Sequence, residues 1–283
     1  MKKRITSVIA SLLLSVAGMQ TAFAQMMKIN LVGNQTLKYN ISQIESIEFE
    51  EEAGDGHEYV EIGGIKWATK NVGATAVAGS YATCCGDYFA WGETETYYAT
   101  MTRTAANAAT FTWKEGYEAG YDISTYHPYT DATLDASHDA ATAAWGEGWR
   151  TPTLEEFKAL AIACAGYGNG DYYSPLALFE GPVTEGGIYW LSETQTFESE
   201  YTGVAGMLFV CADDISKRVF FPAAGGIGST YLSDGGKYGD YWSSSLYTSK
   251  TNSAYRLDFS SSSVYPLSYR NRVNGYPVRP VSD

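Results

Sequence analysis

Side chains that can form many hydrogen bonds gather near the end of the chain. Between Tyr238 and Tyr276, tyrosine, serine, asparagine and glycine make up 22 of 39 residues. Serine hydroxyls without a neighbouring base are weak nucleophiles, so this stretch is not typical of a catalytic site. Tyrosine offers a large, rigid contact surface, and serine, asparagine and glycine supply adaptable hydrogen bonds. The composition favours a binding surface, with a solvent-facing sheet that binds nothing as the alternative.

Residues with the spacing of known catalytic motifs are scarce. The three histidines are His57, His127 and His138, and no GxSxG, HExxH or phosphate-binding loop motif occurs. The glycines of "GGIGS" (225–229) lack the strand–turn–helix setting of a dinucleotide site and indicate a turn. Carboxylate pairs that cleave glycosidic bonds are defined by their separation in space, so an enzyme of that kind stays an alternative. We expect no catalytic residues and no cofactor.

The cysteines support neither a particular disulfide nor a metal site. They are Cys84, Cys85, Cys164 and Cys211. Four cysteines allow three pairings, and adjacent cysteines rarely pair with each other because the geometry is strained. No CxxC motif and no nearby histidine completes a set of metal ligands. Cys164 and Cys211 are expected to be small core residues.

The charge of the chain is uneven. Its 283 residues carry a formal net charge of −13, which favours solubility and disfavours nucleic acid as a partner. From Tyr255 to Asp283 the balance reverses, because four arginines stand against two acidic residues. These arginines are Arg256, Arg270, Arg272 and Arg279. The local excess indicates a separate role for the end of the chain, or ordinary scatter of charge.

The first residues have the pattern of a cleaved signal peptide. Basic residues at 2–4 precede an apolar run too short to cross a bilayer, and Ala22–Ala24 matches a small-x-small cleavage site. Alternation at 28–31 and 44–49 predicts strands on either side of a Gly33-Asn34 turn signal. The expected organisation is a signal peptide at 1–24, a small β module at 25–52, a linker at 53–57 and a main domain at 58–283. No later stretch predicts a transmembrane segment, so we expect export to the periplasm, the cell surface or the medium.

Within the main domain, the best-defined element is a helix over 153–166. Thr153 and Glu156 have the spacing of a capping box, and Gly166 marks the end. The apolar residues at helical spacing are Phe157, Leu160, Ala161 and Cys164. The helix over 153–166 is expected to be scaffold.

Residues 94–148 have weak periodicity, which indicates loops and short helices.

From Gly187 onward, short apolar runs separated by glycine, serine and aspartate predict strands. In Ala254–Phe259 the alternation is regular, with Leu257 and Phe259 on one face and Arg256 and Asp258 on the other. Tyr255 falls on the same predicted face as Leu257. The stretch between Tyr238 and Tyr276, rich in tyrosine and serine, therefore continues a strand pattern and is not a disordered tail.

Six motifs follow one another along residues 58–283. They are "GGIKWATKNVGA", "GDYFAWGET", "DAATAAWGEGWRTPTLEEFKAL", "VFFPAAGG", "GDYWSSSLY" and "GYPVRPV". In this order they resemble the Fibrobacter succinogenes major paralogous domain, a family similar to the C-type lectin-like and formylglycine-generating-enzyme-like folds. The resemblance implies an α+β domain of the C-type lectin-like type, with short antiparallel strands, a few helices and long loops. Sulfatase-modifying enzymes of the related fold need cysteines near the C-terminal end, whereas the last cysteine here is Cys211, which argues against that activity.

The end of the chain also resembles the variable proteins of diversity-generating retroelements, a subset of lectin-fold domains. In that subset, mutagenesis rewrites AAC-like codons, which cannot become Lys, Glu, Gln, Met or Trp while the third base stays a pyrimidine. Residues 251–283 contain none of these five types. The resemblance implies a variable region at 239–283 whose apolar and glycine positions are scaffold. These scaffold positions are Trp242, Leu257, Phe259, Val264, Gly275, Val278 and Val281.

The same resemblance implies which positions contact a ligand. The candidate ligand-binding residues are Tyr247, Thr248, Asn252, Tyr255, Arg256, Asp258, Ser260, Ser261, Tyr265, Ser268, Tyr269, Arg270, Asn271, Arg272, Asn274 and Tyr276. We expect an exported, non-catalytic protein whose C-terminal surface recognises a protein or a glycan and is diversified by a retroelement. The alternatives are a structural or assembly component of the cell surface and a glycan-active or oxidase-like enzyme.

Overall fold

A computed structural model describes residues 26–31, 35–40, 56–96, 98–115, 131–177, 181–228 and 230–282. Contacts divide the chain into two units, Met1–Gly56 and His57–Asp283. In the first unit, β1 (Met26–Leu31) pairs antiparallel with β2 (Gln35–Asn40). The predicted strand at 28–31 therefore exists. The expected signal peptide, the second alternating segment at 44–49 and most of the linker lie outside the described residues.

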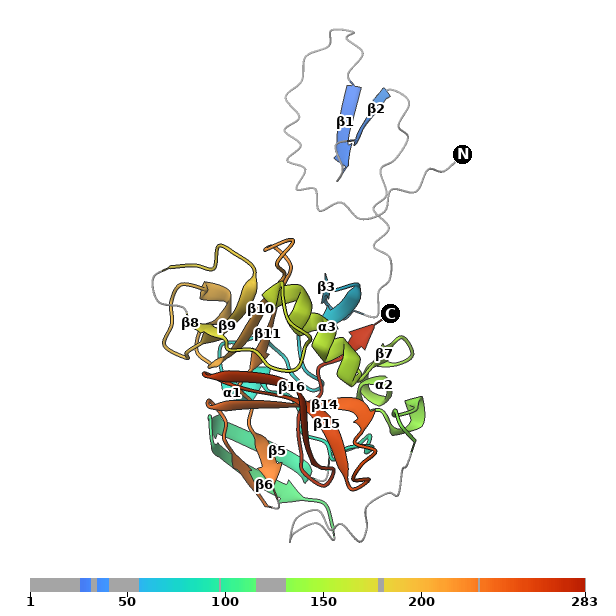
Figure 1. The fold of residues 1–283 in the computed structure, drawn as a ribbon, viewed down its shortest axis with the longest axis vertical. Coiled ribbons are helices and arrows are strands. Elements are labelled where there is room, and N and C mark those ends of the chain that lie inside the picture. The colour runs from blue at the N-terminus through green and yellow to red at the C-terminus, as the bar shows by residue number, and fades with distance from the viewer. Residues whose placement is uncertain are drawn as a thin grey trace, which may run out of the picture. The chain divides into compact units, whose positions relative to one another are not determined.

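The second unit combines several small sheets with few helices, which is an α+β arrangement (Figure 1). One four-stranded sheet has the order β11–β10–β9–β8 and another has the order β3–β4–β17–β7. Their strands are β3 (Tyr59–Ile62), β4 (Ile65–Ala68), β7 (Trp149–Arg150), β8 (Leu176–Ala177), β9 (Gly187–Leu191), β10 (Gly206–Val210), β11 (Arg218–Pro222) and β17 (Val281–Ser282). All pairs in them are antiparallel except β8 with β9.

A three-stranded antiparallel sheet carries most of the predicted variable region. Its strands, in order, are β14 (Tyr238–Leu246), β15 (Ser253–Ser260) and β16 (Ser263–Asn271). The described part of the unit also contains two hairpins, β5 (Tyr98–Ala105) with β6 (Ala108–Trp113) and β12 (Gly226–Gly228) with β13 (Tyr231–Ser233). The helical segments are α1 (Tyr81–Cys84), η2 (Ala136–His138), α2 (Ala140–Trp145), α3 (Leu154–Ala165) and η3 (Ser199–Tyr201). None of the helices in the described part of the chain is long and apolar enough to span a membrane.

The predicted helix over 153–166 is confirmed as α3. The Thr153 hydroxyl accepts a hydrogen bond from the Glu156 backbone N–H, and the Glu156 carboxylate accepts one from the Thr153 backbone N–H. Gly166 ends the helix with a φ of 73°, a left-handed conformation that glycine adopts without strain. Arg150 also holds Glu156 through two hydrogen bonds of 2.7 and 2.6 Å. The sequence rule for helix ends therefore works here because every partner is local.

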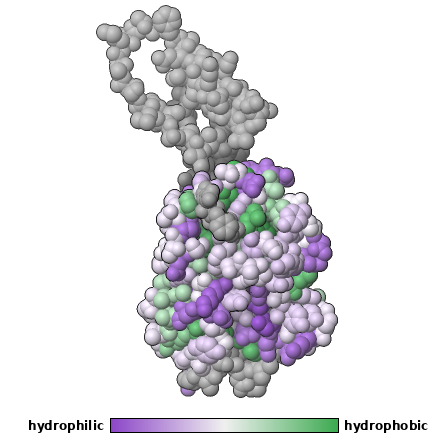
Figure 2. Space-filling model, turned by 60° about the vertical axis from the view of Figure 1, so that its left-hand side comes forward, coloured by the Kyte–Doolittle hydropathy of each residue, from purple (hydrophilic) through white to green (hydrophobic). Residues whose placement is uncertain are grey.

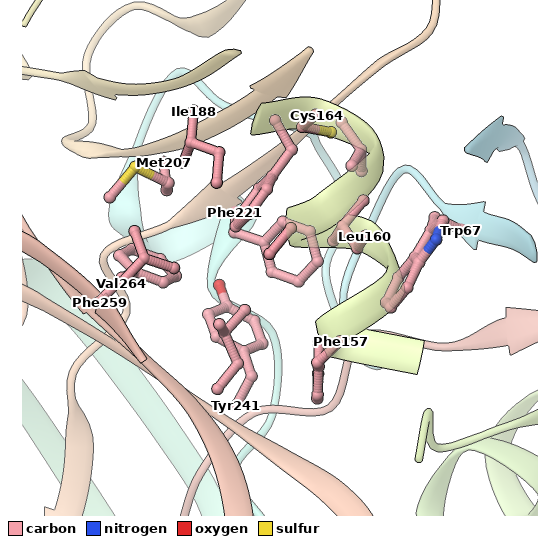
Figure 3. Packing of buried hydrophobic residues seen from close by; sticks show 14 of the residues in the cluster. Trp67, Phe157, Leu160, Cys164, Ile188, Met207, Phe221, Tyr241, Phe259 and Val264 are labelled. Atoms are coloured by element: carbon pink, nitrogen blue, oxygen red, sulfur yellow. The ribbon is translucent and has the colours of Figure 1, made fainter. Parts of the chain in front are cut away.

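The largest hydrophobic core lies where α3 meets the sheets. Figure 3 shows side chains from α3, from β10 and β11 and from β14, β15 and β16 meeting in this core. The ring of Phe221 lies edge-on to Tyr241 with centroids 5.0 Å apart, and the Tyr241 hydroxyl donates to the Pro222 carbonyl at 2.7 Å. All four helix residues predicted to face the core are buried. The seven predicted scaffold positions of the C-terminal region are buried as well.

The prediction of loops and short helices at 94–148 is wrong for residues 98–113, which form the β5–β6 hairpin. The hairpin is anchored from a distant part of the chain. The Asn107 side chain donates to the Gly235 carbonyl at 3.0 Å and accepts from the Gly235 N–H at 2.6 Å. The rings of Tyr98 and Phe111 pack across the hairpin with centroids 5.7 Å apart. The contact between Asn107 and Gly235 joins residues 128 positions apart, which periodicity within the segment does not register. Residues 116–130 lie outside the described chain.

The four cysteines are free and buried. Cys84 and Cys85 lie in and just after α1, with their sulfur atoms 4.0 Å apart. Cys164 is a core residue of α3, as predicted, and Cys211 follows β10 in the same core. Burial raises the pKa of the Cys164 thiol above its ordinary value.

Candidate functional site

The sheet β14–β15–β16 sets the directions of the candidate residues. The β15–β16 pairing is regular from Ser253 to Arg256 and shifts between Arg256 and Asp258, where β16 contains one extra residue. Directly paired residues share a face, and successive residues alternate. Tyr265 pairs with Asp258 and Tyr269 pairs with Tyr255, so the bulge places the two β16 tyrosines on opposite faces of the sheet.

The basic end of the chain is mostly internal. Arg256, Arg272 and Arg279 are at most 2% exposed. Arg270, by contrast, is exposed. The excess of arginines over acids in the sequence therefore does not translate into a broad basic face, because three of the four guanidinium groups serve the interior.

Arg256 is held between two carboxylates. Its guanidinium forms ion pairs with Asp240 on β14 and with Asp258 on its own strand, and it lies 5.2 Å from the ring centroid of Tyr276. A buried charge is tolerated when counterions and aromatic faces surround it. Arg256 therefore ties β14 and β15 to the segment after β16.

Arg279 forms four hydrogen bonds to protein groups. It donates to the Asn71 side chain at 2.8 Å and to the carbonyls of Ala68, Thr69 and Phe220 at 2.7 to 2.9 Å. Burial lowers its pKa to about 10, so it stays protonated at neutral pH. These bonds hold the end of the chain where β17 enters its sheet between β4 and β7 (Figure 1).

Arg272 lies over the ring of Trp91, with its guanidinium carbon 4.8 Å from the ring centroid. Its backbone accepts from the Trp91 N–H and donates to the Asn252 carbonyl. The loop after β16 is thus bonded to the hairpin that connects β14 and β15. The hairpin loop carries the exposed candidates Thr248 and Asn252 and the loop after β16 carries the half-buried Asn274, and these backbone contacts fix their relative position.

Three candidate tyrosines form one cluster at the end of the sheet. The rings of Tyr247 and Tyr269 stack at a centroid distance of 4.1 Å, and Tyr255 meets Tyr247 edge-on at 5.2 Å. Burial, followed by the proximity of Tyr247 and Glu155, raises the pKa of Tyr255. Its phenol therefore remains protonated at neutral pH and can donate a hydrogen bond. Mutual packing limits the rotamers of these rings, which lowers the entropy cost of binding.

A cavity of about 420 Å³ lies beside the end of β16. Its lining residues are Lys250, Ser253, Tyr269, Arg270, Asn271, Asn274 and Tyr276. Five of these seven are candidate residues from the sequence, and they come from β16 and the loop that follows it. The volume lies within the range of small-ligand sites. This is where the structure brings the predicted residues together around a shared space.

The sixteen candidate residues divide by exposure. The exposed ones are Thr248, Asn252, Ser261, Tyr265, Tyr269 and Arg270. The half-buried ones are Tyr247, Tyr255, Asp258, Ser268, Asn271 and Asn274. The buried ones are Arg256, Ser260, Arg272 and Tyr276. We refer to the twelve exposed and half-buried residues as the C-terminal surface; of the buried four, Tyr276 reaches the cavity wall.

Sequence reasoning missed three residues that the structure places with the candidates. Lys250 and Ser253 line the cavity, although lysine is one of the five types that the codon pattern excludes and Ser253 is not among the sixteen candidates. The ring of Tyr172, from the loop after α3, lies 4.8 Å from that of Tyr265. Both rings are almost half exposed. The enrichment in tyrosine is the one sequence feature that bears on Tyr172. Only the fold shows that its ring lies beside that of Tyr265.

A larger hollow of about 680 Å³ lies elsewhere, around residues 197–201 and β11. Its buried acid, Glu198, accepts from the Val183 N–H at 2.6 Å and pairs with Arg218 at 3.0 Å. The two charges thus neutralise each other within the wall. None of the sixteen candidate residues lines this hollow, so the C-terminal cavity remains the better site.

The two histidines that the structure describes contact side chains outside the candidate set. In the part of the chain that the structure describes, no group of three or more His, Cys, Asp and Glu residues could hold a metal ion. His57 stacks on Trp145 at 3.7 Å and meets Trp149 edge-on at 5.8 Å. His138 bonds to Asp135 at 2.9 Å. His127 lies outside the described residues.

The face shown in Figure 2 is mostly pale, with only small separate hydrophobic areas.

Comparison of the chain with protein-family models, with curated proteins and with solved structures gives no match.

Proposed function

We propose that this chain is an exported, non-catalytic recognition protein with a lectin-like fold, and that its C-terminal surface binds a protein or a glycan. The observation that carries the proposal is the cavity beside β16, because five of its seven lining residues belong to the candidate set. The sequence alone predicts those five residues, and they line one concave site.

The chemistry of the surface supports recognition. Stacked tyrosines supply rigid area, and serine, asparagine and arginine side chains supply hydrogen bonds around them. The buried arginines lie behind this surface and attach its loops to the core. A rigid support under exposed polar side chains is the arrangement that lowers the entropy cost of binding.

We further propose that retroelement mutagenesis diversifies part of the C-terminal surface. Exposed positions tolerate many side chains, whereas Arg256, Arg272 and Tyr276 are packed against partners. Related strains should therefore differ at positions such as Thr248, Tyr265 and Arg270 and agree at the buried ones. Sequencing the locus in such strains, with a search beside it for a reverse transcriptase and a template repeat, tests this. An invariant C-terminal region without such neighbours would contradict diversification and leave binding itself untouched.

Binding is tested with one triple variant of the C-terminal surface and one double variant that serves as its control. In the first, Tyr247, Tyr265 and Tyr269 of the C-terminal surface are changed to Ser. In the second, the exposed tyrosines Tyr59 and Tyr231, which lie on β3 and β13, are changed to Ser. The wild-type chain and both variants are applied to a panel of oligosaccharides and cell-surface proteins.

The expected result is at least one ligand that the wild type and the second variant bind and the first variant does not. Circular dichroism of all three proteins checks that they are folded. If the wild-type chain binds no member of the panel, or if the first variant binds as the wild type does, the proposed function is wrong for this surface.

A further inference from the structure

The cavity beside β16 has a one-sided charge. Lys250 and Arg270 are both exposed and line it, and no acidic side chain does. Within the described part of the chain, neither forms an ion pair. The acids of the same sheet, Asp240 and Asp258, are bonded to Arg256. On a chain with a net charge of −13, two unpaired cations at one cavity define a local site for an anion.

The rest of the lining is polar or aromatic. It consists of Ser253, Asn271, Asn274 and the two tyrosines Tyr269 and Tyr276, with no aliphatic side chain. A protein ligand that anchors by an aliphatic side chain would meet tyrosine rings here and no aliphatic partner. A saccharide presents hydroxyl groups to amides and hydroxyls, and C–H faces to aromatic rings. The composition therefore favours a saccharide over a peptide.

The amides are held in place before any ligand arrives. The Asn274 side chain donates to the Asn271 carbonyl at 2.9 Å, and the Asn271 side-chain oxygen accepts from the Val273 N–H at 3.3 Å. Each side chain keeps its other polar atom for a further hydrogen bond. Tyr269 is fixed by its stack on Tyr247 and remains 46% exposed. Groups fixed in this way bind without a large loss of rotamer freedom.

We propose that this cavity binds an acidic saccharide, with Arg270 and Lys250 pairing with its carboxylate or sulfate and Asn271 and Asn274 bonding to its hydroxyls. The inference rests on the proposed recognition function and narrows it to one ligand class. Arginine binds carboxylate and sulfate through two parallel N–H groups, so Arg270 contributes more than Lys250.

The test uses the purified chain and a printed panel of sialylated, uronate-containing and sulfated oligosaccharides, each beside its neutral parent. Acidic members are expected to bind at least about tenfold more tightly than their parents. Raising the salt from about 50 mM to about 300 mM should weaken this binding, because exposed charges are screened.

Calorimetric titration of the tightest acidic member, with sialyllactose against lactose as the reference pair, separates the roles. Arg270→Gln should lower its affinity at least about tenfold and Lys250→Gln about threefold. Lys237→Gln, which removes an exposed lysine from the turn before β14, should leave it within about twofold.

Three outcomes would overturn the inference. Neutral parents that bind as tightly as acidic members contradict the charge argument. Binding that survives Arg270→Gln contradicts the location. An acidic peptide that binds in an Arg270-dependent manner while no acidic saccharide binds contradicts the ligand class. In each case the proposed recognition function stands or falls separately, by the tyrosine variants above.

Discussion

Tyr247 and Tyr269 stack with their ring centroids 4.1 Å apart and their planes 14° from parallel. The first follows β14 and the second lies on β16, so the stack joins the hairpin loop to the edge strand of the sheet. It fixes the two segments that carry most of the C-terminal surface. The order of this surface therefore depends on side-chain packing as well as on backbone pairing.

The stack should contribute measurably to stability. In a double-mutant cycle with Tyr247→Ala and Tyr269→Ala, we expect a coupling free energy of about 0.5–1.5 kcal/mol. Urea unfolding followed by tryptophan fluorescence measures the free energy of unfolding of each variant. A matched cycle of Tyr247→Ala with Tyr231→Ala, two rings that no contact joins, should give a coupling near zero. An equal coupling free energy in both cycles would show that the two rings do not stack in solution.

Arg256 is predicted to be essential for folding stability. Arg256→Gln leaves the partly buried carboxylates of Asp240 and Asp258 without a counterion, so we expect a loss of about 3–5 kcal/mol of unfolding free energy. Adding Asp240→Asn to this variant removes one of the stranded charges and should restore part of the loss. The exposed Arg270→Gln serves as the control and should change stability by less than about 0.5 kcal/mol. A loss equally small for Arg256→Gln would contradict the ion-pair arrangement.

Glu156 should make the fold sensitive to acid. Burial alone would raise its pKa, but the hydrogen bonds from Arg150 and Thr153 outweigh burial, and its pKa lies below the usual 4.5. A lowered pKa contributes stability that is present above the unfolded value and is lost as pH falls through the folded value. Unfolding free energy should therefore fall between about pH 5 and about pH 3, and Glu156→Gln should reduce that fall.

The control for this pH experiment is the neighbouring Glu155, whose side chain is 75% exposed. Glu155→Gln should reproduce the wild-type decrease in stability on acidification. Chemical denaturation at several pH values measures the slopes. If Glu156→Gln and Glu155→Gln gave the same slope as the wild type, the capping and ion-pair network of α3 would not be the source of the acid sensitivity.

Gly239 should tolerate no side chain. A β-carbon at this position of β14 would overlap the ring of Phe259, its cross-strand partner, so Gly239→Ala is expected to cost at least about 1–3 kcal/mol. At Gly228 the nearest atom to such a β-carbon is the Asn274 side-chain oxygen at 3.8 Å, an ordinary contact. Thermal unfolding should therefore show a large decrease in Tm for Gly239→Ala and little change for Gly228→Ala. Similar Tm values for both would contradict the close packing of β14 on β15.

Local sequence determined the elements whose partners are near in the chain. The α3 helix begins at a capping box and ends at Gly166 because these groups lie within one turn of each other. The alternation in β15 placed Leu257 and Phe259 in the core for the same reason, since the period of a strand is a local property. Both features were predictable from spacing alone.

Tertiary structure decided which polar residues are available to a ligand. Alternation placed Arg256 away from the core, but Asp240 and Tyr276 from other segments enclose it. Arg279 is likewise taken up by carbonyls more than fifty residues away in sequence. A bulge in β16 separates Tyr265 from Tyr269, and the fold adds Lys250 to the cavity. The sequence determined which residue types form the C-terminal surface, whereas long-range burial and pairing determined which of them face solvent, because a charge is exposed or internal according to the partners that distant segments bring to it.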